Sequence, residues 1–166
     1  CAASSTGEEP YSIAMTVAEA ISDWDRWDIR ILATDLDTDV LAHGEAGVYR
    51  EDRVSAMPRS RVDRHFVREE GPSGTRLRVR PELARMISFR QLNLMNPLPM
   101  RGPLDVIFCR NVIIYFDKDT QRSMFERFAP LQHEGGLLFL GHSESLFKVS
   151  EAWSLIGKTV YRRCGE

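Results

Sequence analysis

The chain has 166 residues, of which 43% are hydrophobic and 28% are charged, and its formal net charge is −2. These values are typical of one folded domain and exclude an intrinsically disordered protein. No segment approaches the roughly 20 consecutive apolar residues of a membrane-spanning helix, and the first ten residues lack the pattern of a signal peptide. The three cysteines are far apart, so no disulfide framework or zinc site is expected and a reducing cytoplasm fits best.

Positive charge is concentrated in one segment. Residues 50–90 hold eleven of the 22 basic side chains, all of them arginine, and six of the 24 acidic ones. A basic segment in an otherwise acidic chain indicates an anionic partner, or else a solvated surface with local ion pairs. Phe66 and Phe89 are the only aromatic residues there, which is few for base stacking. An acidic protein surface is therefore at least as good a candidate as nucleic acid.

The chain opens with a loop that leads into a helix. Thr6 and Glu9, within the loop over residues 4–10, have the spacing of a capping box. Apolar side chains then recur at helical spacing over residues 13–21. Glu8 and Glu9 also suit the first turn of a helix, where they complement its dipole.

A strand and a second helix follow. Residues 29–34 form a short β-branched apolar run that ends at Asp35. Asp37 or Thr38 can cap the next helix, and Gly47 ends it.

Residues 50–90 then interrupt this order with a predicted antiparallel insertion. Charged and apolar residues alternate over residues 76–80, which indicates a strand with one solvated face. A turn signal at residues 71–74 precedes it, and residues 65–68 are its expected hairpin partner.

Strands and helices alternate again after the insertion. A helix is expected from Asp117 to the Gly135-Gly136 pair, with its buried side formed by Met124, Phe125, Phe128 and Leu131. The expected strands are residues 87–94, 104–109, 137–140, 153–156 and 159–161. The last two would add an antiparallel edge. This alternation predicts an α/β fold with a mostly parallel sheet that is covered on both faces.

Ligands bind such sheets beyond the carboxyl ends of the strands. Asp35 stands at one of these ends, where a carboxylate can accept both hydroxyl protons of a ribose, although acids at strand ends also cap helices. The G-x-G-x-x-G fingerprint of dinucleotide folds is missing, and Glu8 and Glu9 would repel a pyrophosphate. The cofactor should therefore lack a phosphate there and instead carry a cationic group, which a carboxylate favours. A nucleoside with an amino acid or a sulfonium attached meets both conditions, and S-adenosylmethionine is the obvious example.

Four segments occur in an order that resembles one known family. They are residues 3–12 (ASSTGEEPYS), 33–37 (ATDLD), 108–116 (FCRNVIIYF) and 141–144 (GHSE). Nearly end to end, the chain resembles the catalytic domain of the bacterial chemotaxis-type (CheR) protein-glutamate O-methyltransferases. The resemblance implies a class I S-adenosylmethionine-dependent methyltransferase fold over residues 1–166, Rossmann-like, with a small antiparallel β insertion at about residues 50–90 and no metal.

The resemblance also implies roles for individual residues. The cofactor contacts, from the methionine part through the ribose and the adenine to the rest of the pocket, are Glu9, Asp35, Asn93 with Leu94, and Arg110 with Asn111. Tyr115 is implied as the catalytic residue, near the transferred methyl group. The pattern alone leaves other roles open, because Arg110-Asn111 can close a turn and Tyr115 can pack with Phe116. The adjacent His142, Ser143 and Glu144 are expected to form a structural loop and not a hydrolase site.

The implied activity is methyl transfer from S-adenosylmethionine to glutamate side chains of methyl-accepting chemotaxis receptors, giving glutamyl methyl esters and S-adenosylhomocysteine. A glutamate is ionised at pH 7, so the reaction needs in-line positioning and desolvation and no general base. The implied partners are the acidic cytoplasmic helices of the receptors, which the small basic subdomain helps to dock, without nucleic acid or membrane insertion. The alternatives are a non-catalytic signalling module of the same fold and a nicotinamide-dependent oxidoreductase.

Two departures from the family pattern are expected. Members of the family carry an N-terminal helical domain and a first sheet strand before the position of Cys1, so both are expected to lie outside these 166 residues. Glu69 and Glu70 stand before Gly71, where members that bind a receptor's tail peptide have a loop richer in glycine.

Overall fold

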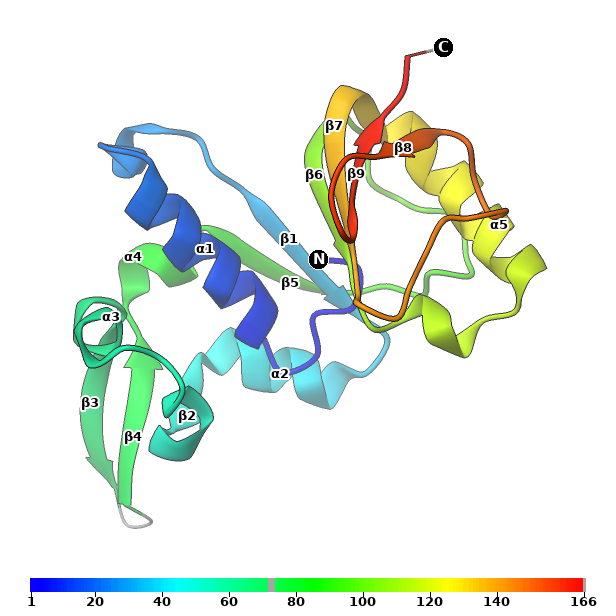
Figure 1. Cartoon of the computed structure of the whole chain (residues 1–166). Coiled ribbons are helices and arrows are strands. Elements are labelled where there is room, and N and C mark those ends of the chain that lie inside the picture. The colour runs from blue at the N-terminus through cyan, green and yellow to red at the C-terminus, as the bar shows by residue number, and fades with distance from the viewer. Residues whose placement is uncertain (72–73, 166) are drawn as a thin grey trace. The chain divides into compact units, whose positions relative to one another are not determined.

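The computed structural model describes residues 1–71 and 74–165 (Figure 1). They form two compact units, which we call the N-unit (Ser4–Gln91) and the C-unit (Cys1–Ala3 with Leu92–Glu166). The described strands pair as three sheets, β1–β5, β2–β4–β3 and β6–β7–β9–β8. The prediction of one mostly parallel sheet is wrong for this part of the chain, because the parallel pairs are divided between two sheets. Within the described ranges, no helix combines the length and the apolar character needed to cross a membrane.

A parallel strand pair forms the centre of the N-unit. The helices α1 (Glu8–Ala20) and α2 (Thr38–Ala46) pack against β1 (Ile31–Asp35) and β5 (Ile87–Gln91) (Figure 1). Alternate side chains of β5 are buried beneath these helices, whereas Ser88 and Arg90, which point to the other face, are exposed. In the described part of the N-unit, helices therefore cover this pair on one face and not on both.

The ends of the two helices test the predicted caps. The Asp37 side chain accepts hydrogen bonds from the first turn of α2, and Gly47 ends that helix with a left-handed φ of 59°, as predicted. Gly7 is the N-cap of α1 and supplies no side chain, so Glu9 occupies the second helical position and not the third. The predicted capping box is wrong for this reason. The Thr6 hydroxyl instead donates to Glu8 Oε2 at 2.6 Å.

The arginine-rich segment folds into a small antiparallel sheet. Its central strand β4 (Gly74–Val79) pairs with β2 (Val48–Arg50) on one side and with β3 (Phe66–Gly71) on the other. Leu77 and Val79 are buried while Arg76, Arg78 and Arg80 are exposed, which confirms the strand with one solvated face and its hairpin partner. Pro72 and Ser73 of the predicted turn lie outside the described residues. The short helices of the N-unit are η1 (Trp24–Arg26), η2 (Glu51–Val54), α3 (Arg59–His65) and α4 (Pro81–Ala84).

The C-unit has a mixed sheet covered by one helix. The strands β6 (Leu104–Cys109) and β7 (Gln132–Leu140) are parallel, and β9 (Val160–Arg163) and β8 (Trp153–Leu155) add the predicted antiparallel edge (Figure 1). Met124 and Phe125 of α5 (Lys118–Phe128) are fully buried. The helix begins after Asp117, whose side chain accepts a hydrogen bond from the Thr120 N–H. The short helices η3 (Ile113–Tyr115) and η4 (Ala129–Leu131) flank α5.

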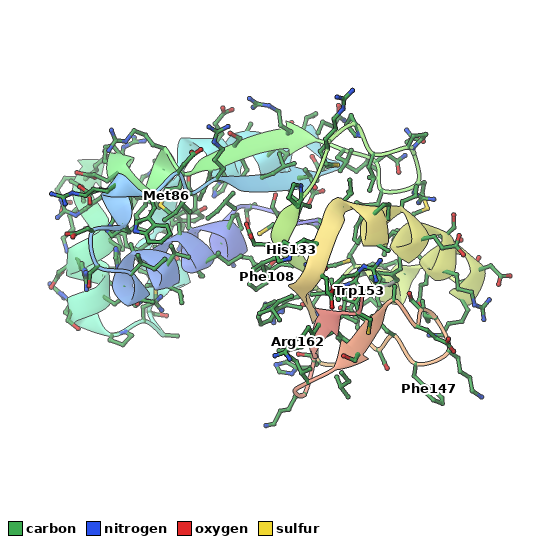
Figure 2. The ribbon with its side chains drawn as sticks, turned by 90° about the horizontal axis from the view of Figure 1, so that it is seen from above. Met86, Phe108, His133, Phe147, Trp153 and Arg162 are labelled. Atoms are coloured by element: carbon green, nitrogen blue, oxygen red, sulfur yellow. The ribbon has the colours of Figure 1, made fainter. Side chains whose placement is uncertain are left out.

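The helix α5 ends earlier than predicted. It stops at Phe128, and Gly135-Gly136 lie within β7. The register against β6 shifts at this place, and Gly135 has a φ of +83°. The glycines therefore allow an irregularity in a strand and do not end a helix. Gln132, three residues before them, is buried and accepts a hydrogen bond from the indole N–H of Trp153 at 2.7 Å. Figure 2 labels Trp153, which is the first residue of β8.

Candidate functional site

The predicted site residues form two clusters, one in each unit. The N-unit holds Glu9 and Asp35. The C-unit holds Asn93, Leu94, Arg110, Asn111 and Tyr115. We describe each cluster within its own unit.

Asp35 ends β1 with its carboxylate held by backbone donors. Its Oδ2 accepts the Ser5 N–H at 2.9 Å, and its Oδ1 accepts the Asp37 N–H at 3.2 Å. Asp37, and not Asp35, caps α2, so the alternative role of Asp35 as a helix cap is wrong. Each carboxylate oxygen has about two acceptor positions, and one on each remains after these bonds. An oriented carboxylate of this kind fits the hydroxyls of a ribose.

The loop before α1 is fixed by close packing. Gly7 has a φ of +94°, and a Cβ there would lie 2.8 Å from Tyr49 Oη and 2.9 Å from Gly44 Cα. The Tyr49 hydroxyl donates to the Thr6 carbonyl at 2.7 Å, and the Tyr11 hydroxyl donates to the Gly44 carbonyl at 2.8 Å. Burial raises the pKa of Tyr11 to about 12 and also raises the pKa of Tyr49, so both remain neutral donors.

The adjacent glutamates have different surroundings. Glu8 forms an ion pair with Arg53 and accepts the Thr6 hydroxyl. Burial acts to raise the pKa of Glu8, but the hydrogen bonds from Arg53 and Thr6 outweigh it and hold that pKa below its usual value. Glu9 is half-buried in the first turn of α1. The protein itself thus occupies the carboxylate of Glu8, and the role of Glu9 in cofactor binding stays a prediction.

Ser4 is a residue that sequence reasoning did not single out. It is 2% exposed, and its hydroxyl oxygen has no hydrogen-bond partner in the described part of the chain. Its backbone N–H donates to the Thr34 carbonyl at 2.8 Å, beside the end of β1. A buried hydroxyl of this kind is normally satisfied by a water or a ligand atom. The only sequence signal was its position in the segment 3–12, because burial could not be deduced from it.

In the C-unit, Asn93 and Leu94 form the turn after β5. Asn93 Oδ1 accepts the Met95 N–H at 2.9 Å. Leu94 is buried, and its carbonyl accepts a hydrogen bond from Arg127 Nη2 at 2.6 Å. These bonds give the turn a fixed shape.

Arg110 and Asn111 follow β6 directly. Asn111 has a left-handed φ of 57°, and its backbone makes the turn into η3. The turn is therefore confirmed, whereas the roles of the two side chains in cofactor binding stay predictions. Tyr115 at the end of η3 is 78% exposed, while Phe116 packs half-buried against the core. This exposure argues against the alternative that Tyr115 only packs with Phe116.

The loop 141–144 is structural, as expected. Glu144 is 6% exposed, and its carboxylate accepts backbone N–H groups of Asn111, Val112, Ile113 and Gly141. His142 and Ser143 are exposed, so the three adjacent residues do not form a hydrolase site. No local pattern predicts that this glutamate holds the turn after β6, because the pattern does not show which side chain of the loop points inward.

Comparisons with known proteins bear on both clusters. Residues 1–162 match the family described as "CheR methyltransferase, SAM binding domain". The chain is 46% identical to the chemotaxis protein methyltransferase of Klebsiella aerogenes over 160 residues, and 45% identical to that of Escherichia coli over 162 residues. These alignments cover 96% of the chain but only 55% and 56% of the two relatives. The chain thus spans little more than half their length.

A solved structure shows the same fold. It is described as "Conversion of a Disulfide Bond into a Thioacetal Group during Echinomycin Biosynthesis", with a TM-score of 0.55 at 9% identity over 98% of this chain and 73% of the other. Together with the family match, this similarity confirms the predicted class I methyltransferase fold. The chain therefore belongs to the CheR methyltransferase family, within its S-adenosylmethionine-binding domain.

Proposed function

We propose that the protein transfers the methyl group of S-adenosylmethionine to glutamate side chains of chemotaxis receptors, giving glutamyl methyl esters and S-adenosylhomocysteine. The observation that carries the proposal is the Asp35 carboxylate, oriented at the end of β1 by two backbone N–H groups in a chain of this family. The small antiparallel sheet of the N-unit is proposed to be the family's inserted subdomain, within a catalytic domain that covers residues 1–166.

The two clusters are assigned to different parts of the cofactor. In the N-unit, Asp35 is proposed to bind the ribose and Glu9 the methionine part. In the C-unit, Asn93 with Leu94 is proposed to bind the adenine, and Arg110 with Asn111 the remaining polar groups. The chemistry of the donors supports these roles, because a carboxylate accepts hydroxyl protons and also favours a cationic ammonium or sulfonium.

The cofactor, when bound, supplies a methyl group on a sulfonium, whose carbon–sulfur electron pair stays on sulfur as the acceptor carboxylate oxygen forms the new bond. An acceptor glutamate is already ionised at neutral pH, so the chain has no proton to remove. Its task is to orient the acceptor in line and to exclude water from the carboxylate. The exposed side chain of Tyr115 is available to contact the acceptor, which supports its proposed catalytic role.

The small sheet supports an acidic receptor helix as partner. Arg50 of β2 lies directly opposite Arg76 of β4, and both are exposed. Like charges in such cross-strand positions destabilise a sheet. The exposed ion pair of Arg50 with Asp52 at 3.2 Å compensates this repulsion only weakly, so an anionic partner would reduce it further. Arg50, Arg53 and Arg76 line a cavity of about 940 Å³ beside this sheet. Acidic residues line it too, and Glu69 pairs with Arg78.

Calorimetry of the complete protein with S-adenosylhomocysteine tests the cofactor site first. We expect saturable binding, no binding of NAD, and an affinity at least tenfold lower in Asp35→Ala, about the effect of one hydrogen bond to a charged group. Asp28→Asn is the matched control, because Asp28 is an exposed acid of the same unit that pairs with Arg30. Binding of NAD alone would instead support an oxidoreductase.

The acceptor is tested by incubation with labelled S-adenosylmethionine and receptor cytoplasmic fragments. A base-labile methyl group on receptor glutamates is expected, since methyl esters hydrolyse readily in base. Binding of S-adenosylhomocysteine without methyl transfer to any receptor would favour the non-catalytic signalling module.

A further inference from the structure

The buried carboxylate of Glu144 is bonded entirely to backbone. Its Oε1 accepts the N–H groups of Val112 and Ile113, both at 2.9 Å, and its Oε2 accepts those of Asn111 at 2.9 Å and Gly141 at 2.6 Å. A carboxylate has about four acceptor positions, so these four donors use its whole capacity. Hydrogen bonds to a charged group are stronger than neutral ones, and they strengthen further away from water.

The surroundings of Glu144 are shaped for this arrangement. A Cβ on Gly141 would lie 2.7 Å from Glu144 Oε2 and 3.0 Å from the Asn111 nitrogen, so only glycine fits there. Asn111 adopts a left-handed φ of 57°, a conformation that asparagine tolerates better than most residues other than glycine. The carboxylate thus holds a tight turn directly after β6.

A second buried polar side chain holds the other end of the same segment. Gln121 of α5 is 6% exposed, and its amide donates to the carbonyl of Ile113 at 2.8 Å and to that of Phe116 at 3.0 Å. Between the two anchors, Ile114 is 50% exposed and Tyr115 is 78% exposed. A short exposed segment is therefore fixed from beneath at both ends.

We propose that Glu144 and Gln121 are positioning residues for the methyl transfer, and this inference rests on the proposed function. Glu144 fixes the turn that presents Arg110 and Asn111 to the cofactor, and it also holds the start of η3. Gln121 fixes the end of η3 and so orients Tyr115 toward the acceptor. The two residues divide the task. In the described part of the chain, the Gln121 amide bonds to Ile113 and Phe116 and not to the Asn111 turn, whereas Glu144 bonds to both that turn and the start of η3.

Stability alone is a poorer account of this network. Burying a carboxylate carries a desolvation penalty, and apolar residues of similar volume often stabilise a core equally well. The segment that the network orders directs its two most exposed side chains outward and not into the core. Ordering of exposed groups is what a site requires.

Two variants of the complete protein separate the roles. In Glu144→Gln, an NH₂ group replaces one oxygen and faces two N–H donors. We expect the affinity for S-adenosylhomocysteine and the kcat of receptor methylation each to fall at least tenfold. In Gln121→Met, we expect kcat to fall about tenfold while the affinity for S-adenosylhomocysteine stays within twofold of the wild type. Glu126→Gln, an exposed position on α5, is the control and leaves both values unchanged.

All values are measured well below the unfolding transition of each variant, where a merely structural role would leave them at the wild-type level. Wild-type affinity and kcat in folded Glu144→Gln would overturn the proposal, as would an equal loss of cofactor affinity in Gln121→Met.

Amide hydrogen exchange gives an independent readout. Exchange of the Asn111, Val112, Ile113 and Gly141 amides is expected to accelerate in Glu144→Gln while that of α5 stays slow. A wild-type protein that bound no S-adenosylhomocysteine would refute the proposed function, whereas unchanged exchange would refute the role of Glu144.

Discussion

The two units fix their candidate residues in different ways. The N-unit uses close backbone packing at Gly7, neutral tyrosine hydroxyls and ion pairs at its surface, such as those of Arg53 and Arg61. The C-unit uses one buried carboxylate, Glu144, bonded to four backbone N–H groups. Surface ion pairs are individually weak, whereas a buried charge is strongly tied to its donors. Removing one charge, that of Glu144, should therefore disturb the C-unit most. Adding one side-chain carbon, a Cβ at Gly7, should disturb the N-unit most.

The largest effect is expected for Gly7→Ala. The new Cβ would lie 2.9 Å from the Gly44 backbone, and the alanine would have to adopt the φ of +94°. Overpacking and backbone strain together should lower the free energy of unfolding by about 3 kcal/mol. Gly74→Ala is the matched control, because its φ is +98° but no atom lies within 4 Å of the new Cβ. Urea unfolding measures both. Equal losses in the two variants would show that close packing does not fix this loop.

A smaller effect is expected for Glu19→Gln in the N-unit. Glu19 pairs with Arg61 and with the buried His65. Burial acts to raise the pKa of Glu19, but the hydrogen bonds from His65 and Arg61 outweigh it and lower that pKa below 4.5. A lowered carboxyl pKa gives stability that is present above the unfolded value and is lost as the pH falls through the folded value.

Glu19→Gln should therefore cost about 1 kcal/mol or less at pH 7, the range of partly exposed pairs, and nothing at a pH well below 4. Denaturant unfolding as a function of pH measures the difference, with the exposed Glu82→Gln as control. A loss that persisted at low pH would contradict the role of the ion pairs.

The smallest effect on stability is expected for Tyr115→Phe in the C-unit. Its ring is 78% exposed, so the free energy of unfolding should change by less than about 0.5 kcal/mol. The kcat of methyl transfer should fall, since the hydroxyl is proposed to act near the reacting atoms. Tyr161→Phe provides the opposite pattern, because its buried hydroxyl accepts the Leu146 N–H and its removal should lower stability without touching kcat. An unchanged kcat in Tyr115→Phe would remove this residue from the site.

Local signals in the sequence predicted much of the fold. The Asp37 cap, the Gly47 stop and the alternating strand before Arg80 each depend on neighbouring residues, and each was confirmed. The helix end predicted at the Gly135-Gly136 pair was wrong, because glycine is as common at an irregularity in a strand as at the end of a helix. The roles of Ser4 and Glu144 depend on burial and on partners about 30 residues away in the chain, and no local pattern reports these.

The tryptophans give each unit its own optical signal. Trp153 is 4% exposed, stacks edge-on against Phe125 and is the single tryptophan of the C-unit, whereas Trp24 and Trp27 belong to the N-unit and Trp27 is 64% exposed. Emission from Trp153 should be blue-shifted in the native protein and should shift to red when the C-unit opens. In a Trp153→Phe variant, the remaining emission would come from the N-unit alone. Fluorescence can therefore follow the unfolding of each unit separately, without any added label.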